Sequence, residues 1–361
     1  MDQRNWMEKA IEVAQTSGRK TPGIPFMSML YVKGDDLIAT WNNSLHPECH
    51  LFFQNLPIGS GGTLFFPYEP TKISEMMLWI LKSEINQIFI SVLNTDTPLE
   101  FVQWAQENKI AVEYQFLKGL GERLNEIHLF NRQADIPFIT LSFGMSLDGK
   151  IATRTGDSKY ISGNESRQFV HHLRHTHQSI LVGINTILID HPKLTTRLND
   201  FQGVDPIRII LDSTLKIDLE EPLLHQNSSA LTYIVTHSSS DSIKKQKLLR
   251  NGVKIIEMSG PKSPLDLHQV LAHLKSIGIE SILVEGGSTI HFSFIKARYF
   301  NRLYATISPI IIGGETAKSA VGGEGFETLK AATKLKFIEW KQWGDDVIVE
   351  AVHPSVQKEE D

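Results

Sequence analysis

Two clusters of small and polar residues could together form a ligand site. The first, Ser146–Gly149, follows the apolar run Phe138–Met145, and the second, Asn185–Arg197, follows the apolar run Ser179–Gly183. Both runs are typical of buried strands. In an open α/β sheet, ligands bind outside the carboxyl ends of the strands, where both clusters would lie. One such cluster is often an ordinary turn, but two clusters that each combine Gly, Asp and a cation favour a ligand site.

A third segment, Val284–Thr289 (VEGGST), has the composition of an anion site. It follows an apolar run and opens a predicted helix over Ile290–Lys296. Its glycines let a ligand approach the backbone, and the free N–H groups and dipole of the helix favour an anion such as pyrophosphate. A plain Gly-Gly turn is the alternative, and Ile310–Glu315 (IIIGGE) could likewise be only a strand end.

Two arginines and a group of histidines accompany these turns. Arg174 and Arg197 are candidates to bind a substrate anion, because a guanidinium matches a phosphate with paired hydrogen bonds. Exposed arginines without a ligand are the alternative. His171 and His175 stand four residues apart, as metal ligands on a helix can. No third ligand stands out near them, so we interpret this stretch as a polar helix face.

The composition excludes several classes of protein. A length of 361 residues exceeds what one hydrophobic core usually serves, which predicts two domains. The net charge of −5 argues against nucleic-acid binding, and a single cysteine, Cys49, excludes disulfides and a cysteine-based zinc cage. No apolar run is long enough to cross a bilayer, and the first residues do not resemble a signal peptide. We expect a soluble cytoplasmic protein that binds no membrane.

Strand and helix patterns alternate along the first part of the chain. Strands are predicted at 28–33, 63–66, 87–92 and 111–115, and helices at 5–16, from His46, 73–82, 98–108 and 119–131. This alternation is typical of a three-layer α/β domain with a largely parallel sheet. The polar segment Asn131–Pro137 is the predicted linker.

The second part begins with the strand at 138–145 and continues the alternation. Further strands are predicted at 179–183, 207–212, 231–236, 253–258 and 281–284, and helices at 165–177, 242–251 and 265–277. The last predicted strands, 303–309, 335–340 and 346–353, have no long helix between them, which favours an antiparallel edge. The predicted fold class is α/β, with domains over residues 1–131 and 137–356.

Five segments of the second domain carry a family resemblance. SLDGKIAT, TGDSKYIS, LVGINTILIDHPKLTTR, IRIILDS and VEGGS, in this order and spacing, resemble the reductase domain of the bifunctional riboflavin-biosynthesis deaminase/reductase over residues 138–352. The resemblance implies a dihydrofolate-reductase-like fold and homodimers. It also implies NADPH-dependent reduction of the ribosyl group of 5-amino-6-(5-phosphoribosylamino)uracil, a small phosphorylated pyrimidine, to the ribitylamino product.

The same resemblance assigns the site residues. The positions that it implies for the cofactor are Gly144, Tyr160, Thr186, Asp190, Ser213, Gly286, Gly287 and Ser288, and those for the substrate are Ser158, Arg174, Leu194, Arg197 and Glu285. Hydride transfer is chemistry of the cofactor, so the protein mainly holds the nicotinamide against C1′ of the sugar. A proton must also reach the opening ring oxygen, and Asp190 and Glu285 are the catalytic candidates.

One position departs from the bacterial pattern. Two-domain bacterial members usually carry a lysine four residues before the serine of SLDG, where this chain has Ser142. Archaeal and fungal single-domain reductases also lack that lysine, and they act on the 2,5-diamino pyrimidinone before deamination. That compound is therefore an alternative substrate. A folate-like pterin would leave Arg174 and Arg197 without a phosphate, and a non-catalytic scaffold is a further alternative.

The first domain resembles the zinc deaminase of the same family, with its metal ligands lost. His46-Pro47-Glu48 resembles the HAE segment, and Thr63–Thr71 (TLFFPYEPT) resembles TLxxTLEPC with Thr71 at the first cysteine ligand. No cysteine follows, and a catalytic zinc needs three protein ligands. We predict a cytidine-deaminase-like domain without zinc, and its role stays open between bracing the reductase dimer, docking a separate deaminase and having no present function. An unusual site of His46, Cys49 and His50 is the alternative.

Overall fold

Two units, Met1–Ala134 and Asp135–Asp361, divide the chain. The computed structural model describes residues 2–15, 24–42, 61–71, 74–159, 161–199, 203–260 and 264–354. Each unit has its own sheet and its own buried apolar clusters. The division falls within the polar segment that separates the two predicted domains. Among the described residues, no helix is both long and apolar enough to cross a membrane.

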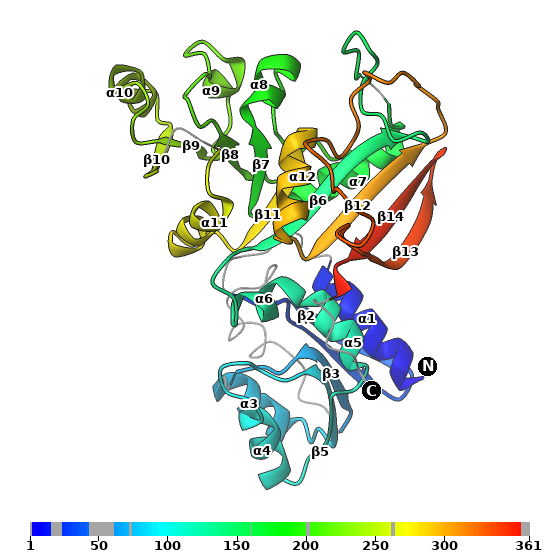
Figure 1. The fold of residues 1–361 in the computed structure, drawn as a ribbon. Helices are drawn as coiled ribbons and strands as arrows, with labels where there is room; N and C mark the ends of the chain where they lie inside the picture. The colour runs from blue at the N-terminus through cyan, green and yellow to red at the C-terminus, as the bar shows by residue number, and fades with distance from the viewer. Residues whose placement is uncertain are drawn as a thin grey trace. The chain divides into compact units, whose positions relative to one another are not determined.

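The first unit is a three-layer α/β domain. Its described strands form one sheet in the order β2-β1-β3-β4-β5. They are β1 (Ser28–Lys33), β2 (Asp36–Asn42), β3 (Thr63–Tyr68), β4 (Gln87–Val92) and β5 (Ala111–Tyr114), and the helices are α1 (Gln3–Gln15), α3 (Ser74–Lys82), α4 (Glu100–Glu107), α5 (Lys118–Leu124) and α6 (Glu126–Asn131). Helices α3 and α4 cover one face of the sheet, and α1 and α5 cover the other (Figure 1). Trp79 and Phe101 belong to the apolar cluster on the first face, and Trp6 and Leu124 to the cluster on the second.

Two predictions for this unit are wrong in part. Among the described strands of this unit, only β3, β4 and β5 run parallel, because β1 is antiparallel to β3 and forms a hairpin with β2. Strand β2 is absent from the predicted elements, because it is half-exposed along most of its length and lacks a strong apolar pattern. The predicted helix at 119–131 is broken at Asn125, whose side chain hydrogen-bonds the backbone N–H and carbonyl of Phe26. The helix predicted from His46 lies outside the described residues.

The described strands of the second unit form a nine-stranded sheet in the order β10-β9-β8-β7-β11-β6-β12-β14-β13. The strands are β6 (Phe138–Ser146), β7 (Ser179–Gly183), β8 (Ile207–Leu211), β9 (Thr232–His237), β10 (Lys254–Met258), β11 (Ser281–Gly286), β12 (Arg302–Ser308), β13 (Lys336–Trp343) and β14 (Asp346–Val352), and the helices are α7 (Asn164–Thr176), α8 (Ile184–Asp190), α9 (Pro222–His225), α10 (Ser242–Arg250), α11 (Leu267–Ser276) and α12 (Ser288–Ala297). Strands β10 to β12 in this order are parallel, and central strands such as β7 are apolar runs buried on both faces. Helices α11 and α12 cover one face, and α8, α9 and α10 pack on the other.

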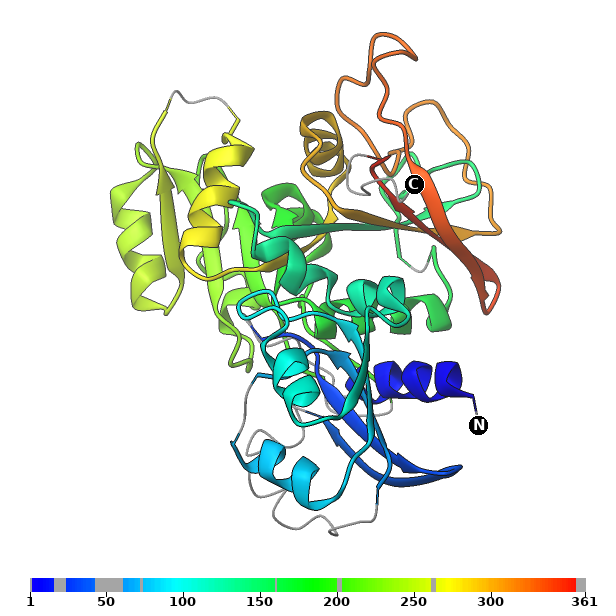
Figure 2. The same cartoon turned by 90° about the horizontal axis from the view of Figure 1, so that it is seen from below.

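The antiparallel edge predicted for the end of the chain is confirmed, because β12, β14 and β13 pair antiparallel in that order. Strand β14 is antiparallel to both β12 and β13, whereas β12 is parallel to β6. Helix α12 connects β11 to β12 across β6, and a crossover helix returns the chain in the same direction. A long coil joins β12 to β13 (Figure 2). The sequence analysis also missed the short helices α8 and α9.

Candidate active site

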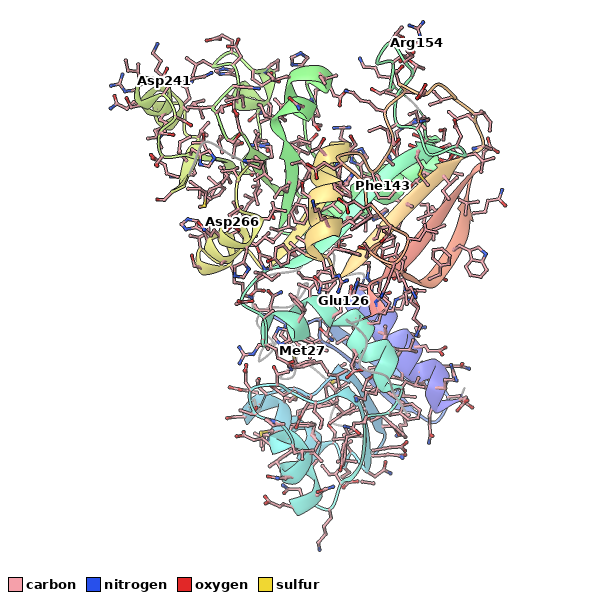
Figure 3. All side chains as sticks on the ribbon, in the orientation of Figure 1. Met27, Glu126, Phe143, Arg154, Asp241 and Asp266 are labelled. Carbon is pink, nitrogen blue, oxygen red and sulfur yellow. The ribbon has the colours of Figure 1, made fainter. Side chains whose placement is uncertain are left out.

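The two polar clusters and the glycine turn lie at one edge of the second sheet. Strands β7, β11 and β6 are adjacent and parallel, so their last residues, Gly183, Gly286 and Ser146, end at the same side. The loop that leaves β6 there has Arg154 at its tip (Figure 3). The sheet therefore brings together residues that are up to about 140 positions apart in sequence, as the strand-end rule predicts.

A buried ion pair joins Arg174 of α7 to Glu285 of β11. The Nε and Nη2 atoms of Arg174 donate to the two carboxylate oxygens at 2.7 and 2.6 Å, and Nη1 donates to the Thr195 carbonyl at 2.9 Å. The two side chains are only 13% and 11% exposed. Burial by itself lowers the pKa of Arg174, but the adjacent carboxylate outweighs it and raises the pKa above its ordinary value. Three N–H groups of Arg174 are thus bound to protein partners, so fewer of its N–H groups can donate to a substrate phosphate.

Arg197 is the more exposed of the two arginines. Its Nη1 donates to Thr195 Oγ1 at 2.7 Å, and its side chain lies at the surface. Desolvation first, and then the charge of Arg174, lower the pKa of its guanidinium. In the same loop Leu194 has φ 50° and is 2% exposed within an apolar cluster, so only its backbone could meet a ligand. Arg197 is therefore the better placed of the two arginines to bind an anion.

His171 and His175 of α7 are buried and His172 is half-buried, which corrects the interpretation as a polar helix face. His171 and His175 are 8% and 5% exposed, and each accepts a backbone N–H through Nδ1, from Arg197 at 3.3 Å and from Val204 at 3.1 Å. Nothing in the described part of the chain groups three His, Cys, Asp or Glu side chains as a metal site. These histidines fasten a loop that periodicity alone could not place beside the helix.

The glycine turn after β11 is tied to α8. The Gly287 N–H donates to Thr186 Oγ1 at 3.1 Å, and Gly286 has φ 149°, which a residue with a side chain rarely adopts. Helix α12 starts at the next residue and has no side-chain cap on its first turn. The N–H groups of this turn are therefore not satisfied by a side-chain cap, as an anion site requires.

The SLDG turn is held by Asp148, which the sequence analysis did not single out. Its carboxylate accepts the Ser146 hydroxyl at 2.6 Å and the backbone N–H groups of Ile312 and Gly313 at 3.1 and 2.7 Å. These three hydrogen bonds, the first from Ser146, lower the pKa of Asp148 to about 2. The turn therefore fixes the IIIGGE segment, whose glycine at 313 has positive φ. The Asp-Gly pair at 148–149 indicates a turn in the sequence, but it does not reveal that the carboxylate binds the distant segment at 312–313.

The remaining predicted residues are dispersed along the same edge. Ser158 Oγ donates to Asp190 Oδ1 at 3.5 Å, and both lie at the surface. Gly144 is exposed on β6, and a side chain there would meet Ser162 at 3.8 Å. The Ser213 carbonyl accepts hydrogen bonds from the end of β9, at Thr236 and His237, and from Ser240 just after it. Tyr160 lies outside the described residues.

Similar proteins define the family of this chain. The family model described as the RibD C-terminal domain matches residues 137–349. The riboflavin biosynthesis protein RibD of Bacillus amyloliquefaciens is 33% identical over 358 residues, which cover 96% of this chain and 95% of that protein. The 2,5-diamino-6-ribosylamino-4(3H)-pyrimidinone 5′-phosphate reductase of Methanothermobacter thermautotrophicus is 36% identical over 215 residues, 59% of this chain and 97% of that protein.

The chain belongs to the RibD family. A solved structure of the Thermotoga maritima diaminohydroxyphosphoribosylaminopyrimidine deaminase/5-amino-6-(5-phosphoribosylamino)uracil reductase covers 97% of this chain and 98% of its own, with a TM-score of 0.78 and 23% identity. This likeness shows the same fold, a deaminase-like unit followed by a dihydrofolate-reductase-like unit. The family resemblance and the fold class predicted from the sequence are confirmed.

A buried carboxylate supports the first unit from inside. Glu69 is fully buried, and its carboxylate accepts the backbone N–H groups of Asn94, Leu99, Phe101 and Val102. It therefore joins the end of β3 to the start of α4. Thr71, at the position predicted for a cysteine ligand, is exposed. The remnant residues His46 and Glu48 lie outside the described residues, as does Cys49.

Proposed function

We propose that the second unit uses NADPH to reduce the ribosyl group of 5-amino-6-(5-phosphoribosylamino)uracil to the ribitylamino product of riboflavin biosynthesis. The observation that carries the proposal is the buried Arg174–Glu285 pair directly before the turn in which Thr186 holds Gly287. The carboxylate of this pair suits the hydroxyls of a sugar, and the turn suits the pyrophosphate of a dinucleotide. Membership of the RibD family favours a reductase over a non-catalytic scaffold.

The glycine turn fits the pyrophosphate of NADPH. An added Cβ at Gly287 would lie 3.4 Å from Thr186 Oγ1, so a side chain would crowd the place where backbone N–H groups meet the anion. Within the described residues, the N–H groups of Ser288 and Thr289 have no hydrogen-bond acceptor. NADPH, when bound, supplies the hydride that C1′ of the sugar receives. Gly144, Tyr160, Asp190 and Ser213 would then contact other parts of the cofactor.

The substrate groups follow from the charges at the site. The exposed guanidinium of Arg197 would bind the 5′-phosphate, with Arg174 behind it holding Glu285 and the Thr195 carbonyl. The Glu285 carboxylate already accepts two charge-assisted hydrogen bonds, so it suits the acceptor role toward ribose hydroxyls better than proton donation. The opening ring oxygen needs a proton, and Asp190, which lies at the surface beside Ser158, can relay one from solvent.

Oxidation of NADPH by the full-length protein tests the proposal. The deaminated and the 2,5-diamino ribosylamine phosphates are offered in separate reactions without an added deaminase. We expect turnover of the deaminated compound. Preference for the diamino compound would make that compound the substrate instead. Turnover of neither compound would overturn the reductase proposal.

The 2,5-diamino pyrimidinone phosphate is the second candidate substrate. Ser142 supports it, since this side chain is 5% exposed on the same face of β6 as Gly144 and replaces the lysine of the bacterial pattern. The relative named for that substrate is also 36% identical to this chain over 215 residues. Ser142→Lys should shift the ratio of kcat/KM toward the deaminated compound if the diamino compound is the natural one.

We infer that the first unit has no zinc-dependent deaminase activity and that a separate deaminase supplies the substrate. Support comes from Thr71 at a ligand position, because a threonine hydroxyl is a poor substitute for a zinc-bound thiolate. Metal analysis of the purified chain should find less than about 0.1 zinc per chain. Zinc in equal amount, together with deamination of the diamino compound, would contradict this inference.

We also propose that the reductase forms a homodimer through the face of the sheet around β13. An apolar cavity of about 590 Å³ opens there, lined among others by Met145, Leu303 and Val349. Phe337 and Trp340 of β13 are 66% and 70% exposed, although large aromatic side chains are usually covered. Sedimentation should show a dimer, and Trp340→Glu should shift the protein toward the monomer. A monomer in the unchanged protein would exclude this arrangement.

A further inference from the structure

One face of α7 fastens the loop that carries Arg197. Gln168, His171 and His175 follow each other at intervals of three and four residues, so they project from one side of the helix. His171 Nδ1 accepts the Arg197 N–H at 3.3 Å, and Gln168 Nε2 donates to the Arg197 carbonyl at 3.3 Å. Gln168 Oε1 accepts the Asn199 N–H at 3.2 Å. Both backbone polar groups of Arg197 are therefore held by side chains of α7.

His171 is suited to this task by its protonation state. An imidazole nitrogen accepts a hydrogen bond only when it carries no proton, so the bond from Arg197 requires neutral His171. Burial first, and then the charges of Arg174 and Arg197, lower the pKa of His171 to about 4. The side chain is only 8% exposed, which keeps competing water away. At neutral pH, Nδ1 of His171 is therefore free of a proton and can accept the Arg197 N–H.

The same helix also sets the other half of the substrate site. Arg174 lies one turn after His171 and holds both carboxylate oxygens of Glu285. Arg174 Nη1 also reaches the carbonyl of Thr195, two residues before Arg197. Helix α7 therefore fixes the exposed cation at Arg197 and the carboxylate at Glu285 relative to each other, although 88 residues separate them in the chain.

We propose that His171 is a positioning residue for the substrate phosphate, acting through the backbone of Arg197. The proposal rests on the proposed reductase function. A guanidinium at the surface loses side-chain and backbone freedom when it binds a phosphate, and a backbone already held by α7 lowers that cost. His171 itself touches no reacting atom, so its loss should weaken substrate binding more than the chemical step.

The test compares two substitutions with a matched control. His171→Asn keeps an acceptor oxygen where Nδ1 stands, and His171→Leu removes it. His177 is a control at the end of the same helix, since it is equally buried and hydrogen-bonds the Leu173 carbonyl and Thr140 hydroxyl in the interior. We expect His171→Leu to raise the substrate KM about tenfold with kcat within about twofold, because roughly one hydrogen bond is lost. His171→Asn should keep KM close to that of the unchanged protein, and His177→Leu should lower stability without changing KM.

Amide hydrogen exchange gives a readout that needs no turnover. His171→Leu should speed exchange of the Arg197 N–H in the free protein, and His171→Asn should return it toward the unchanged rate. If the unchanged protein turns over neither pyrimidine but the exchange pattern holds, the proposed function fails and the loop contact stands. An unchanged KM in a folded His171→Leu protein, or equal KM changes in His171→Leu and His171→Asn, would overturn the positioning role.

Discussion

Arg174 couples two parts of the candidate site through one guanidinium. Its fork of N–H groups reaches Glu285 and the Thr195 carbonyl at the same time, which the single ammonium of lysine cannot reproduce. We expect Arg174→Lys to reduce the free energy of unfolding by about 2–3 kcal/mol and to raise the substrate KM. Urea denaturation and steady-state kinetics measure the two effects. Arg250→Lys, at the exposed end of α10, is the control and should change neither.

His171 also makes stability depend on pH. Its pKa is lowered to about 4 in the folded protein, against about 6.5 in an unfolded chain. Between these values the unfolded chain binds a proton that the folded protein does not, so this contribution is complete above about pH 6.5 and is lost as the pH falls toward about 4. The stability difference between the unchanged protein and His171→Asn should therefore shrink from pH 7 to pH 5. A constant difference in urea titrations at these pH values would contradict the assignment.

At the scale of elements, the junction of α8 with α12 shapes the predicted cofactor site. The Thr186 hydroxyl of α8 holds the Gly287 N–H, and the first turn of α12 has no side-chain cap. Thr186→Val keeps the shape of the side chain but removes this bond. We expect the Kd of NADPH, measured by fluorescence, to rise about five- to tenfold, because one hydrogen bond contributes about 1 kcal/mol of binding free energy. Thr176→Val removes a hydroxyl that bonds the Leu173 carbonyl and should leave NADPH binding unchanged.

At the scale of the whole molecule, each unit contains its own hydrophobic core. The apolar clusters of the first unit and those of the second share no residue, and the chain divides between Ala134 and Asp135. A chain of residues 135–361 should therefore fold alone, with a cooperative thermal transition, and should bind NADPH as tightly as the full protein. Failure of this fragment to fold would show that the first unit is required to brace the reductase.

The sequence by itself determined the local elements and the family. Continuous apolar runs such as Ser179–Gly183 predict buried strands, because side chains buried on both faces of a parallel sheet leave no polar alternation. The motifs from SLDGKIAT to VEGGS were enough to predict the reductase fold. Two local features were not predicted. Strand β2 is half-exposed and so has little apolar pattern, and Asn125 interrupts a helical pattern through a hydrogen bond to Phe26, 99 residues earlier.

Only the tertiary structure decided which side chains share the site. Arg174 meets Glu285 across 111 residues, and Asp148 meets Gly313 across 165, since sheet order brings these positions to one edge. The four-residue spacing of His171 and His175 is equally compatible with a metal site and with an exposed face. Both side chains are buried and accept hydrogen bonds from backbone N–H groups, which contradicts an exposed face and argues against a metal site. Hydrogen-bond partners depend on long-range packing, which sequence periodicity does not encode.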